Sequence, residues 1–328
     1  MKGSFRMPFL ITAGVVLLFA LIVFFAVNYF FNMAFRRVKP KKSKLDSDFF
    51  TSLEKKGMKE EIKRIREGRE YIKSLPYEDV YTDSYDGLRL HAKYYKNGDG
   101  KKVILLAHGY KSRGDHDFSC AFEPYKRQGF DFLLIDQRAH GESEGKYICF
   151  GTKERFDVCR WCEFLVGRNG DDVKIILDGI SMGCTTVILA AALPELPKNV
   201  KGVIGDCGFT DAKSEISYVA RHDYKLPPFP AVNLLEAVCK ARAGFGFSDA
   251  STLEAVKNIK VPIIFVHGEA DDYVLCENSV KNYEACTSEN KWLFTVPGAG
   301  HGLSFLADEK GCTEALDKFF EVALSEGK

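Results

Sequence analysis

The sequence predicts an α/β protein whose core is a doubly wound, mostly parallel sheet, preceded by one transmembrane helix. Three observations support this fold class. Residues 77–328 alternate between apolar runs typical of buried strands and segments with helical periodicity. The pentapeptide Gly179-Ile180-Ser181-Met182-Gly183 lies between one such strand and one such helix. No residue from Met7 to Phe35 is charged.

The uncharged N-terminal segment has the length and composition of a membrane anchor. A helix of roughly 20 apolar residues crosses the hydrocarbon core of a bilayer, and residues 7–35 are enough for this. A cleaved signal peptide would have an apolar stretch of only about 7–15 residues and a small-residue cleavage site. No clear Ala-x-Ala site is present. We therefore expect residues 1–36 to form a retained, single-pass anchor.

Basic residues flank this span unequally. Lys2 and Arg6 precede it, and a larger basic group follows it closely, made up of Arg36, Arg37, Lys39, Lys41, Lys42 and Lys44. The positive-inside rule therefore predicts that the domain after the span faces the cytoplasm. Many of the 10 cysteines lie within predicted helices and strands rather than in loops, which agrees with a compartment that keeps thiols reduced.

Two further parts follow the anchor. Residues 37–76 contain the basic juxtamembrane segment and one amphipathic helix over 45–75, which Pro76 ends and which we expect to pack on the main domain. Residues 77–328 form that main domain. Its alternation breaks at about 208–260, where short helices at 214–218 and 234–242 surround a proline-rich turn. We interpret this insertion as a lid over the site, with three aromatic residues that either line an acyl pocket or pack the lid down: Phe229, Phe245 and Phe247.

Eight strand-like runs organise the main domain. The first two are joined through Asp86-Gly87, which indicates an antiparallel hairpin. The predicted strands are 80–82, 88–95, 103–107, 130–135, 173–177, 203–204, 263–266 and 292–296. The predicted helices are 120–128, 153–166, 185–192 and 308–324. Ligands of such sheets bind beyond the carboxyl ends of the strands, and the loops discussed next all follow a strand directly.

The pentapeptide has the pattern of a nucleophile elbow. A serine at the apex of a strand-to-helix turn adopts a strained backbone conformation, so the neighbouring positions require glycine. The start of the following helix presents free N–H groups to whatever the serine oxygen attacks. We therefore expect Ser181 to be the nucleophile.

Four further loops carry a family resemblance. From about Tyr77 to its end, the chain resembles the α/β-hydrolase superfamily, in particular its serine aminopeptidase and monoglyceride-lipase-like branch. The resemblance implies the α/β-hydrolase fold with a short helical lid. The loops that carry it are His108-Gly109-Tyr110 (oxyanion loop), Asp136-Gln137-Arg138-Ala139-His140-Gly141-Glu142-Ser143 (the Asp-x-Arg-x-His-Gly-x-Ser loop), His267-Gly268-Glu269-Ala270-Asp271 (acid loop) and Gly300-His301-Gly302 (base loop).

The base and the acid follow the nucleophile in the chain order of this fold. Of the histidines after Ser181, His222 lies in the insertion, His267 ends a strand, and His301 lies between two glycines after the last strand. We expect His301 to take the serine proton. His108, His140 and His267 each precede a glycine and are expected to brace their own loops.

Three aspartates compete for the role of the acid that orients the base. Asp271 and Asp272 both follow the seventh strand, and the Gly-x-x-Asp spacing from Gly268 favours Asp271. Asp206, after the sixth strand, is the alternative, because some members of the superfamily place their acid there. The expected oxyanion donors are the backbone N–H groups of Tyr110 and Met182.

The sequence indicates neither a cofactor nor a metal. Cys159 and Cys162 form a single Cys-x-x-Cys inside a predicted helix, without a second ligand pair. The acidic cluster Asp115-His116-Asp117 is interpreted as the solvated start of a helix. A net charge of +1 gives no indication of a nucleic-acid partner.

Together these features predict a membrane-anchored serine hydrolase that cleaves a small-molecule acyl ester, or a thioester or amide, through an acyl-enzyme on Ser181. An ester is preferred because the insertion is apolar and no site for a peptide amino terminus is evident. A serine peptidase or aminopeptidase of the same fold is the alternative within enzymes. A non-catalytic binding protein with a hydrolase fold is the alternative from another class.

Overall fold

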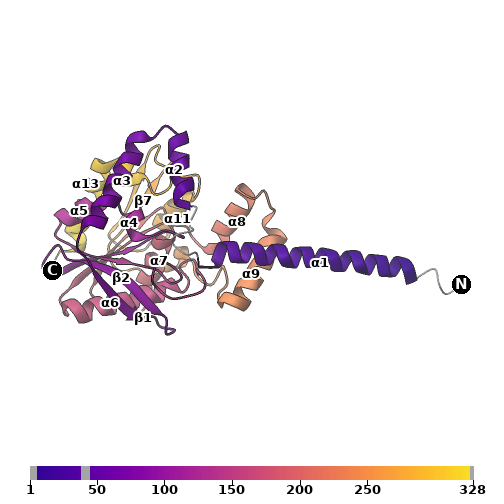
Figure 1. Ribbon diagram of the computed structural model, residues 1–328. Helices are drawn as coiled ribbons and strands as arrows, with labels where there is room; N and C mark the ends of the chain where they lie inside the picture. The colour runs from indigo at the N-terminus through magenta and orange to yellow at the C-terminus, as the bar shows by residue number, and fades with distance from the viewer. Residues whose placement is uncertain (1–5, 38–44, 326–328) are drawn as a thin grey trace.

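The computed structural model describes residues 6–37 and 45–325 of the chain (Figure 1). Its centre is an 8-stranded sheet in the order β1-β2-β4-β3-β5-β6-β7-β8. β1 and β2 pair antiparallel, β2 also pairs antiparallel with β4, and all other neighbours are parallel. The predicted fold class is thereby confirmed. The strands are β1 (Glu78–Asp83), β2 (Arg89–Tyr95), β3 (Lys102–Ala107), β4 (Asp131–Ile135), β5 (Lys174–Ile180), β6 (Val200–Asp206), β7 (Ile263–Gly268) and β8 (Lys291–Val296).

Helices cover both faces of this sheet. One face packs on α6 (Glu154–Asn169), α7 (Met182–Ala191) and α10 (Thr252–Ala255). The other packs on α3 (Lys59–Ser74), α5 (Phe122–Arg127) and α13 (Glu309–Ala323). The remaining helices of the main domain are α4 (Gly114–Asp117), α8 (Ala212–His222), α9 (Pro228–Ala243), α11 (Glu277–Ala285) and α12 (Ser304–Ala307).

The central strands are apolar on both faces because helices cover both. In β5, Ile175 and Leu177 belong to the core on one face and Ile176 to the core on the other. Successive side chains of a strand point to opposite faces, so a strand buried on both sides reads as a continuous apolar run. This is why the central strands were evident from the sequence.

The amphipathic segment before the main domain forms two helices rather than the single helix predicted. α2 (Leu45–Lys55) and α3 are separated by a turn at Gly57, whose φ of 75° is in the left-handed region that favours glycine. The two helices pack on the main domain, as expected, with Leu53, Ile62 and Ile65 against Leu303 and Leu306. The three- and four-residue spacing of the apolar residues predicted one helix with weak points at Gly57 and Gly68, and the helix breaks at the first of these.

The N-terminal helix α1 (Arg6–Phe35) has two distinct portions. Residues Leu10 to Ile22 are exposed along their whole length, and the helix from Leu10 to Phe35 is long and apolar enough to cross a membrane, with a hydropathy of 3.0. Its C-terminal portion lies between α8 and α9, on the side of the domain from which the exposed portion extends (Figure 1). Of the basic residues that flank the predicted span, Lys2, Lys39, Lys41, Lys42 and Lys44 lie outside the described residues.

The last turns of α1 are part of the core of the main domain. Phe31 and Phe35 are fully buried, and the Phe35 ring stacks on Phe247 with centroids 5.5 Å apart. The backbone carbonyl of Phe35 accepts a hydrogen bond from the N–H of Ile148 at 2.7 Å. Aromatic side chains bury large apolar areas, so this contact fixes the end of α1 to the main domain.

We predict that α1 contributes to the stability of the folded domain. Phe35→Ala should lower the free energy of unfolding by about 3–5 kcal/mol, because it removes a buried aromatic ring and leaves a cavity. Phe25→Ala, on the same helix at a position 66% exposed, is the matched control and should leave stability unchanged. Thermal unfolding of the detergent-solubilised full chain measures both variants. Equal stability of the two would contradict the prediction.

Candidate functional site

Ser181 lies at a sharp turn between β5 and α7. Its backbone has φ 57° and ψ −117°, a conformation that costs free energy for a non-glycine residue. The neighbouring glycines permit the turn. A Cβ atom on Gly179 would lie 2.2 Å from the Gly183 carbonyl oxygen, and one on Gly183 would lie 1.9 Å from that of Ala107. The turn therefore holds the serine next to the end of β3.

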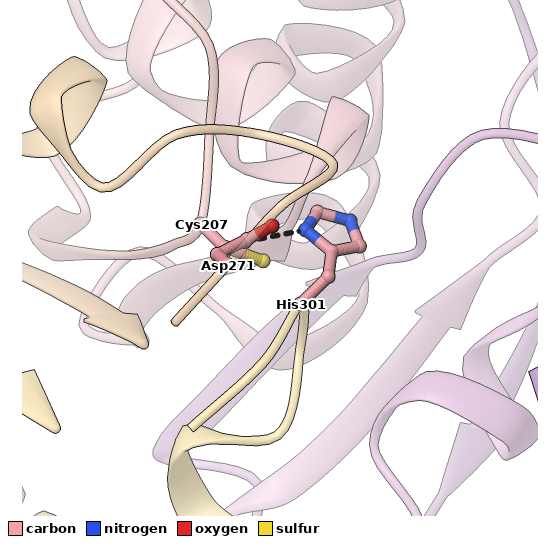
Figure 2. A group of neighbouring side chains, drawn as sticks. All are labelled: Cys207, Asp271 and His301. Atoms are coloured by element: carbon pink, nitrogen blue, oxygen red, sulfur yellow. Dashed lines mark hydrogen bonds and ion pairs between the residues drawn. The ribbon is translucent and has the colours of Figure 1, made fainter. Parts of the chain in front are cut away.

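The structure brings Ser181, His301 and Asp271 into one hydrogen-bonded chain. His301 Nε2 lies 2.9 Å from Ser181 Oγ, and His301 Nδ1 lies 2.7 Å from Asp271 Oδ2. Figure 2 shows the His301 ring and the Asp271 carboxylate, with a dashed line at their contact. Since Nδ1 faces a carboxylate, it carries the proton, which leaves Nε2 free to accept the hydroxyl proton of Ser181. The three residues come from the ends of three different strands.

The acid loop holds Asp271 as a buried carboxylate. Its Oδ1 accepts hydrogen bonds from the backbone N–H groups of Tyr273 and Val274, each at 2.9 Å. Burial alone would raise the pKa of Asp271, but the hydrogen bonds from His267 and His301 outweigh it and hold the pKa below its ordinary value. His267 also contacts Ser279 and the Val274 carbonyl, and so braces this loop as expected.

The other two aspartates considered for this role lie elsewhere. Asp272 is exposed, and its backbone carbonyl accepts a hydrogen bond from Tyr218. Asp206 ends β6, and its Oδ1 is buried without a hydrogen-bond partner among the described residues. Burial raises the pKa of Asp206 to about 6. His301 thus contacts Asp271 rather than either competitor.

The electrostatics of His301 follow from its position between Asp271 and the protein interior. Burial acts to lower the pKa of His301, but the hydrogen bond and the negative charge of Asp271 outweigh burial and raise this pKa above its ordinary value of 6.5. A carboxylate in this position favours the imidazolium form that results when the ring takes a proton from the serine.

The loop after β3 lies against Ser181. A Cβ atom on Gly109 would lie 3.4 Å from Ser181 Cβ, which places the Tyr110 backbone beside the serine. Met182 is the first residue of α7, so its N–H is one of the four that a helix leaves without an internal partner. The sequence reading did not assign Asp117 to this loop. Its carboxylate accepts hydrogen bonds from the Gly109 N–H and the Ser112 hydroxyl, and so it fixes the loop.

The loop at residues 136–143 is braced by buried polar contacts. Arg138 forms two 2.6 Å hydrogen bonds to Asp157 and two more to Asp86. His140 accepts a hydrogen bond from the Lys111 N–H, and burial lowers its pKa to about 3, so it is neutral. His108 likewise accepts a hydrogen bond from the Gln137 N–H. These residues support the site without facing Ser181.

A cavity of about 540 Å³ opens at Ser181 and His301. Its far wall includes apolar residues of α2, α3, α12 and α13, among them Leu53, Ile65, Leu306 and Leu316. None of the described residues of the 208–260 insertion lines it. The predicted acyl-pocket aromatics therefore have another place: Phe245 and Phe247 are buried against Phe35, and Phe229 is exposed. Of the two expectations for these aromatics, packing holds for Phe245 and Phe247, and the helix pair α2–α3 supplies a wall of the cavity instead.

Cys207 lies beside Asp271 and His301 (Figure 2), and one ligand atom from each lies within 4.8 Å of the others. A metal-ligating cysteine must be a thiolate, but burial raises the pKa of Cys207 well above its ordinary value. The Nδ1 atom of His301 and Oδ2 of Asp271 also bond to each other. These three side chains therefore fit a hydrogen-bonded His301–Asp271 pair beside a neutral thiol better than a metal site. The other cysteine motif, Cys159 and Cys162, is buried and free within α6.

Glu215 is a further acidic residue near the site that the sequence did not single out. It lies on α8, is 7% exposed, and its Oε1 has no hydrogen-bond partner in the described part of the chain. Burial raises its pKa to about 8, although the charge of His301 acts to lower it. The sequence pattern of an amphipathic helix does not predict that an acidic residue on it is buried. The burial of Glu215 is therefore evident only from the fold.

Comparisons with known proteins agree with this architecture. Residues 102–234 match the family model described as the alpha/beta hydrolase fold. The chain is 26% identical over 193 residues to YqkD of Bacillus subtilis (strain 168), a match that covers 59% of this chain and only 63% of that protein. It is 25% identical over 260 residues to a bifunctional esterase/perhydrolase of Acinetobacter calcoaceticus, covering 68% of this chain and 93% of the relative.

A solved structure gives the same result for the fold. The Pyrococcus furiosus esterase PF2001 superimposes with a TM-score of 0.62 at 22% identity, over 76% of this chain and 91% of that one. The chain has the α/β-hydrolase fold. In this α/β hydrolase, the loops that carried the sequence resemblance lie at the carboxyl ends of the strands, around Ser181.

We predict that Asp271 sets the pKa of His301. In spectra of the full chain with ¹⁵N-labelled histidine, His301 should titrate above 6.5. Asp271→Asn should lower this pKa, because it removes a negative charge that stabilises the imidazolium form. Asp206→Asn is the matched control and should lower it less, since Asp206 does not bond to the ring. A larger shift in the Asp206 variant would move the acid to β6.

Proposed function

We propose that this hydrolase is a membrane-anchored serine esterase that forms an acyl-enzyme on Ser181. The observation that supports this most directly is the hydrogen-bonded chain from Ser181 through His301 to Asp271. A serine hydroxyl is a weak nucleophile until a positioned base takes its proton. The three groups have the contacts that such activation requires.

In the proposed reaction, Ser181 Oγ attacks the carbonyl carbon of the substrate while His301 Nε2 takes the hydroxyl proton. Asp271 keeps the ring in the correct tautomer and stabilises the imidazolium. The oxyanion faces the backbone N–H groups of Tyr110 and Met182, and one such donor typically contributes on the order of 3 kcal/mol. His301 then gives its proton to the leaving alcohol, and water, activated by the same ring, hydrolyses the acyl-enzyme.

Two observations favour an ester among the possible acyl substrates. One wall of the cavity that opens at Ser181 consists of apolar side chains from α2, α12 and α13, which suits an acyl chain. The Acinetobacter relative and the Pyrococcus structure are both named as esterases. A thioester or an amide reacts by the same steps and differs only in its leaving group.

We expect a fluorophosphonate probe to label Ser181. An activated hydroxyl beside oxyanion donors attacks phosphorus readily, whereas an ordinary serine does not. Ser181→Ala should abolish labelling and lower turnover by up to about 10⁶-fold. Ser304→Ala, which also removes a buried hydroxyl, is the control and should label normally. Mass spectrometry locates the adduct. A wild-type chain that neither labels nor turns over any ester would support the non-catalytic binding alternative.

A peptidase is the second candidate, and Glu215 is the observation that favours it. Its carboxyl group is buried near His301, and its Oε1 has no hydrogen-bond partner in the described part of the chain. Glu215 does not line the cavity, so the ammonium group of an aminoacyl substrate would pair with it only by reaching beyond the cavity wall. A panel of acyl esters of graded chain length and of aminoacyl amides separates the two activities. We expect turnover of the esters and little effect of Glu215→Gln on them. Preferential cleavage of the amides, lost in Glu215→Gln, would instead establish the peptidase.

We propose further that α1 crosses the membrane once and that the domain faces the cytoplasm. The charge bias around the span supports this orientation, and all ten cysteines are free, as in a reducing compartment. Protease added to intact cells should spare the domain and digest it only after lysis. Digestion in intact cells, or native disulfides, would place the domain outside.

A further inference from the structure

The position of the domain on the end of α1 is fixed by direct contacts. The last carbonyl groups of a helix lack internal partners, and in α1 two of them accept hydrogen bonds from the loop beside Ser181. Tyr110 OH donates to the Ala34 carbonyl at 2.5 Å, and Lys111 Nζ donates to that of Met33. On the other side, Arg242 of α9 donates to Asn28 at 3.0 Å. The domain therefore follows the helix as a rigid unit.

The length of free helix is too short to keep the domain away from the bilayer. Residues from Leu10 to Ile22 are exposed, and burial begins at Val23 and continues through Val27, Phe31 and Phe35 on one face. From Met7 to Ile22 the helix rises about 24 Å at 1.5 Å per residue, while the hydrocarbon core is about 30 Å thick. A span that starts after Arg6 must extend to about Ala26. Tilting the helix requires still more residues.

The membrane-side end of the domain is formed by the segment after α8 together with the first turns of α9. Four large side chains are exposed here, which we call the lid surface: Tyr224 (44%), Leu226 (37%), Phe229 (76%) and Leu234 (41%). Tyr224 joins this surface to α1, because its ring lies 5.3 Å from that of Phe30 and its hydroxyl contacts the Met33 sulfur at 3.5 Å. Figure 1 shows α8 and α9 on either side of α1 where the helix leaves the domain.

The charges around the lid surface suit phospholipid headgroups. Between residues 221 and 242, Arg221, Lys225, Lys240 and Arg242 outnumber the acidic Asp223 and Glu236. Aromatic rings and aliphatic side chains next to basic groups are typical of segments that lie in the membrane interface. An exposed apolar cluster of this kind would favour aggregation if this face were in contact with water.

We propose that the lid surface docks into the headgroup and outer acyl region of the bilayer that α1 spans. This inference rests on the proposed anchor. Tyr110 both lines the cavity and bonds to the end of α1, so docking holds the cavity close to the interface. The substrate class that this position favours is an amphipathic acyl ester carried in that leaflet.

The experiment uses tryptophan fluorescence of the full chain in vesicles of phosphatidylcholine brominated on the acyl chain near the headgroup. Phe229→Trp should lose fluorescence relative to vesicles of unbrominated lipid, because bromine quenches only in contact range. Val322→Trp is the control: it is 36% exposed on α13, on the side of the domain opposite α1 (Figure 1), and should not be quenched. The 2 native tryptophans provide the background measured in the wild-type chain.

Four outcomes are decisive. Quenching of Phe229→Trp but not of Val322→Trp supports docking, and Leu234→Trp gives a second reading if the first variant folds poorly. A chain that resists alkaline extraction yet shows no quenching overturns the docking while the anchor stands. A chain that is extracted by alkali overturns the anchor itself. Cross-linking of Leu226→Cys between two chains, together with absent quenching, would assign the lid surface to a second copy.

Discussion

The site depends on how closely the start of α7 approaches the end of β3. Gly183 makes this possible, because any Cβ atom there would collide with the carbonyl oxygen of Ala107. The same approach brings the Gly109–Tyr110 backbone beside Ser181 and aligns the serine with the loops after β7 and β8. A strained serine backbone is held by the packing of a buried sheet and a buried helix. Removing that contact would separate the proposed nucleophile from its proposed oxyanion donors.

Burial gives the carboxyl groups around Ser181 different protonation states. Asp271 accepts hydrogen bonds from two backbone N–H groups and two histidines, and it stays ionised. Asp178 accepts a hydrogen bond from Tyr125, and burial raises its pKa to about 8. Asp206 has an unpartnered oxygen and an intermediate pKa of about 6. The hydrogen-bond donors and histidine charges that face each carboxyl group oppose burial to different extents, and they decide which group can support an imidazolium ion.

The N-terminal helix has a structural role besides the proposed anchoring. Its exposed portion is uniformly apolar, whereas its last turns fill a core formed with α9 and the loop at Ile148. Because the Tyr110 hydroxyl donates a hydrogen bond to the end of this helix, Tyr110 connects the loop beside Ser181 to the proposed anchor. A soluble fragment that begins after α1 would lose both Phe31 and Phe35 from the core. The helix pair α2–α3 also contributes to the site from the N-terminal side, because its residues form a wall of the cavity.

The sequence by itself determined the fold class, the eight strands and the apolar span, because these depend on local periodicity and on glycines at required positions. It also singled out Ser181, His301 and Asp271, since chain order and loop position restrict the choices. The tertiary structure decided what depends on contacts between distant segments. The helix expected over 45–75 breaks at Gly57, and the resulting pair α2–α3 forms a wall of the cavity that the insertion does not reach. Glu215 is buried, and Asp271 rather than Asp206 contacts His301. Side-chain burial and partner choice arise only when distant segments pack together, so no local pattern encodes them.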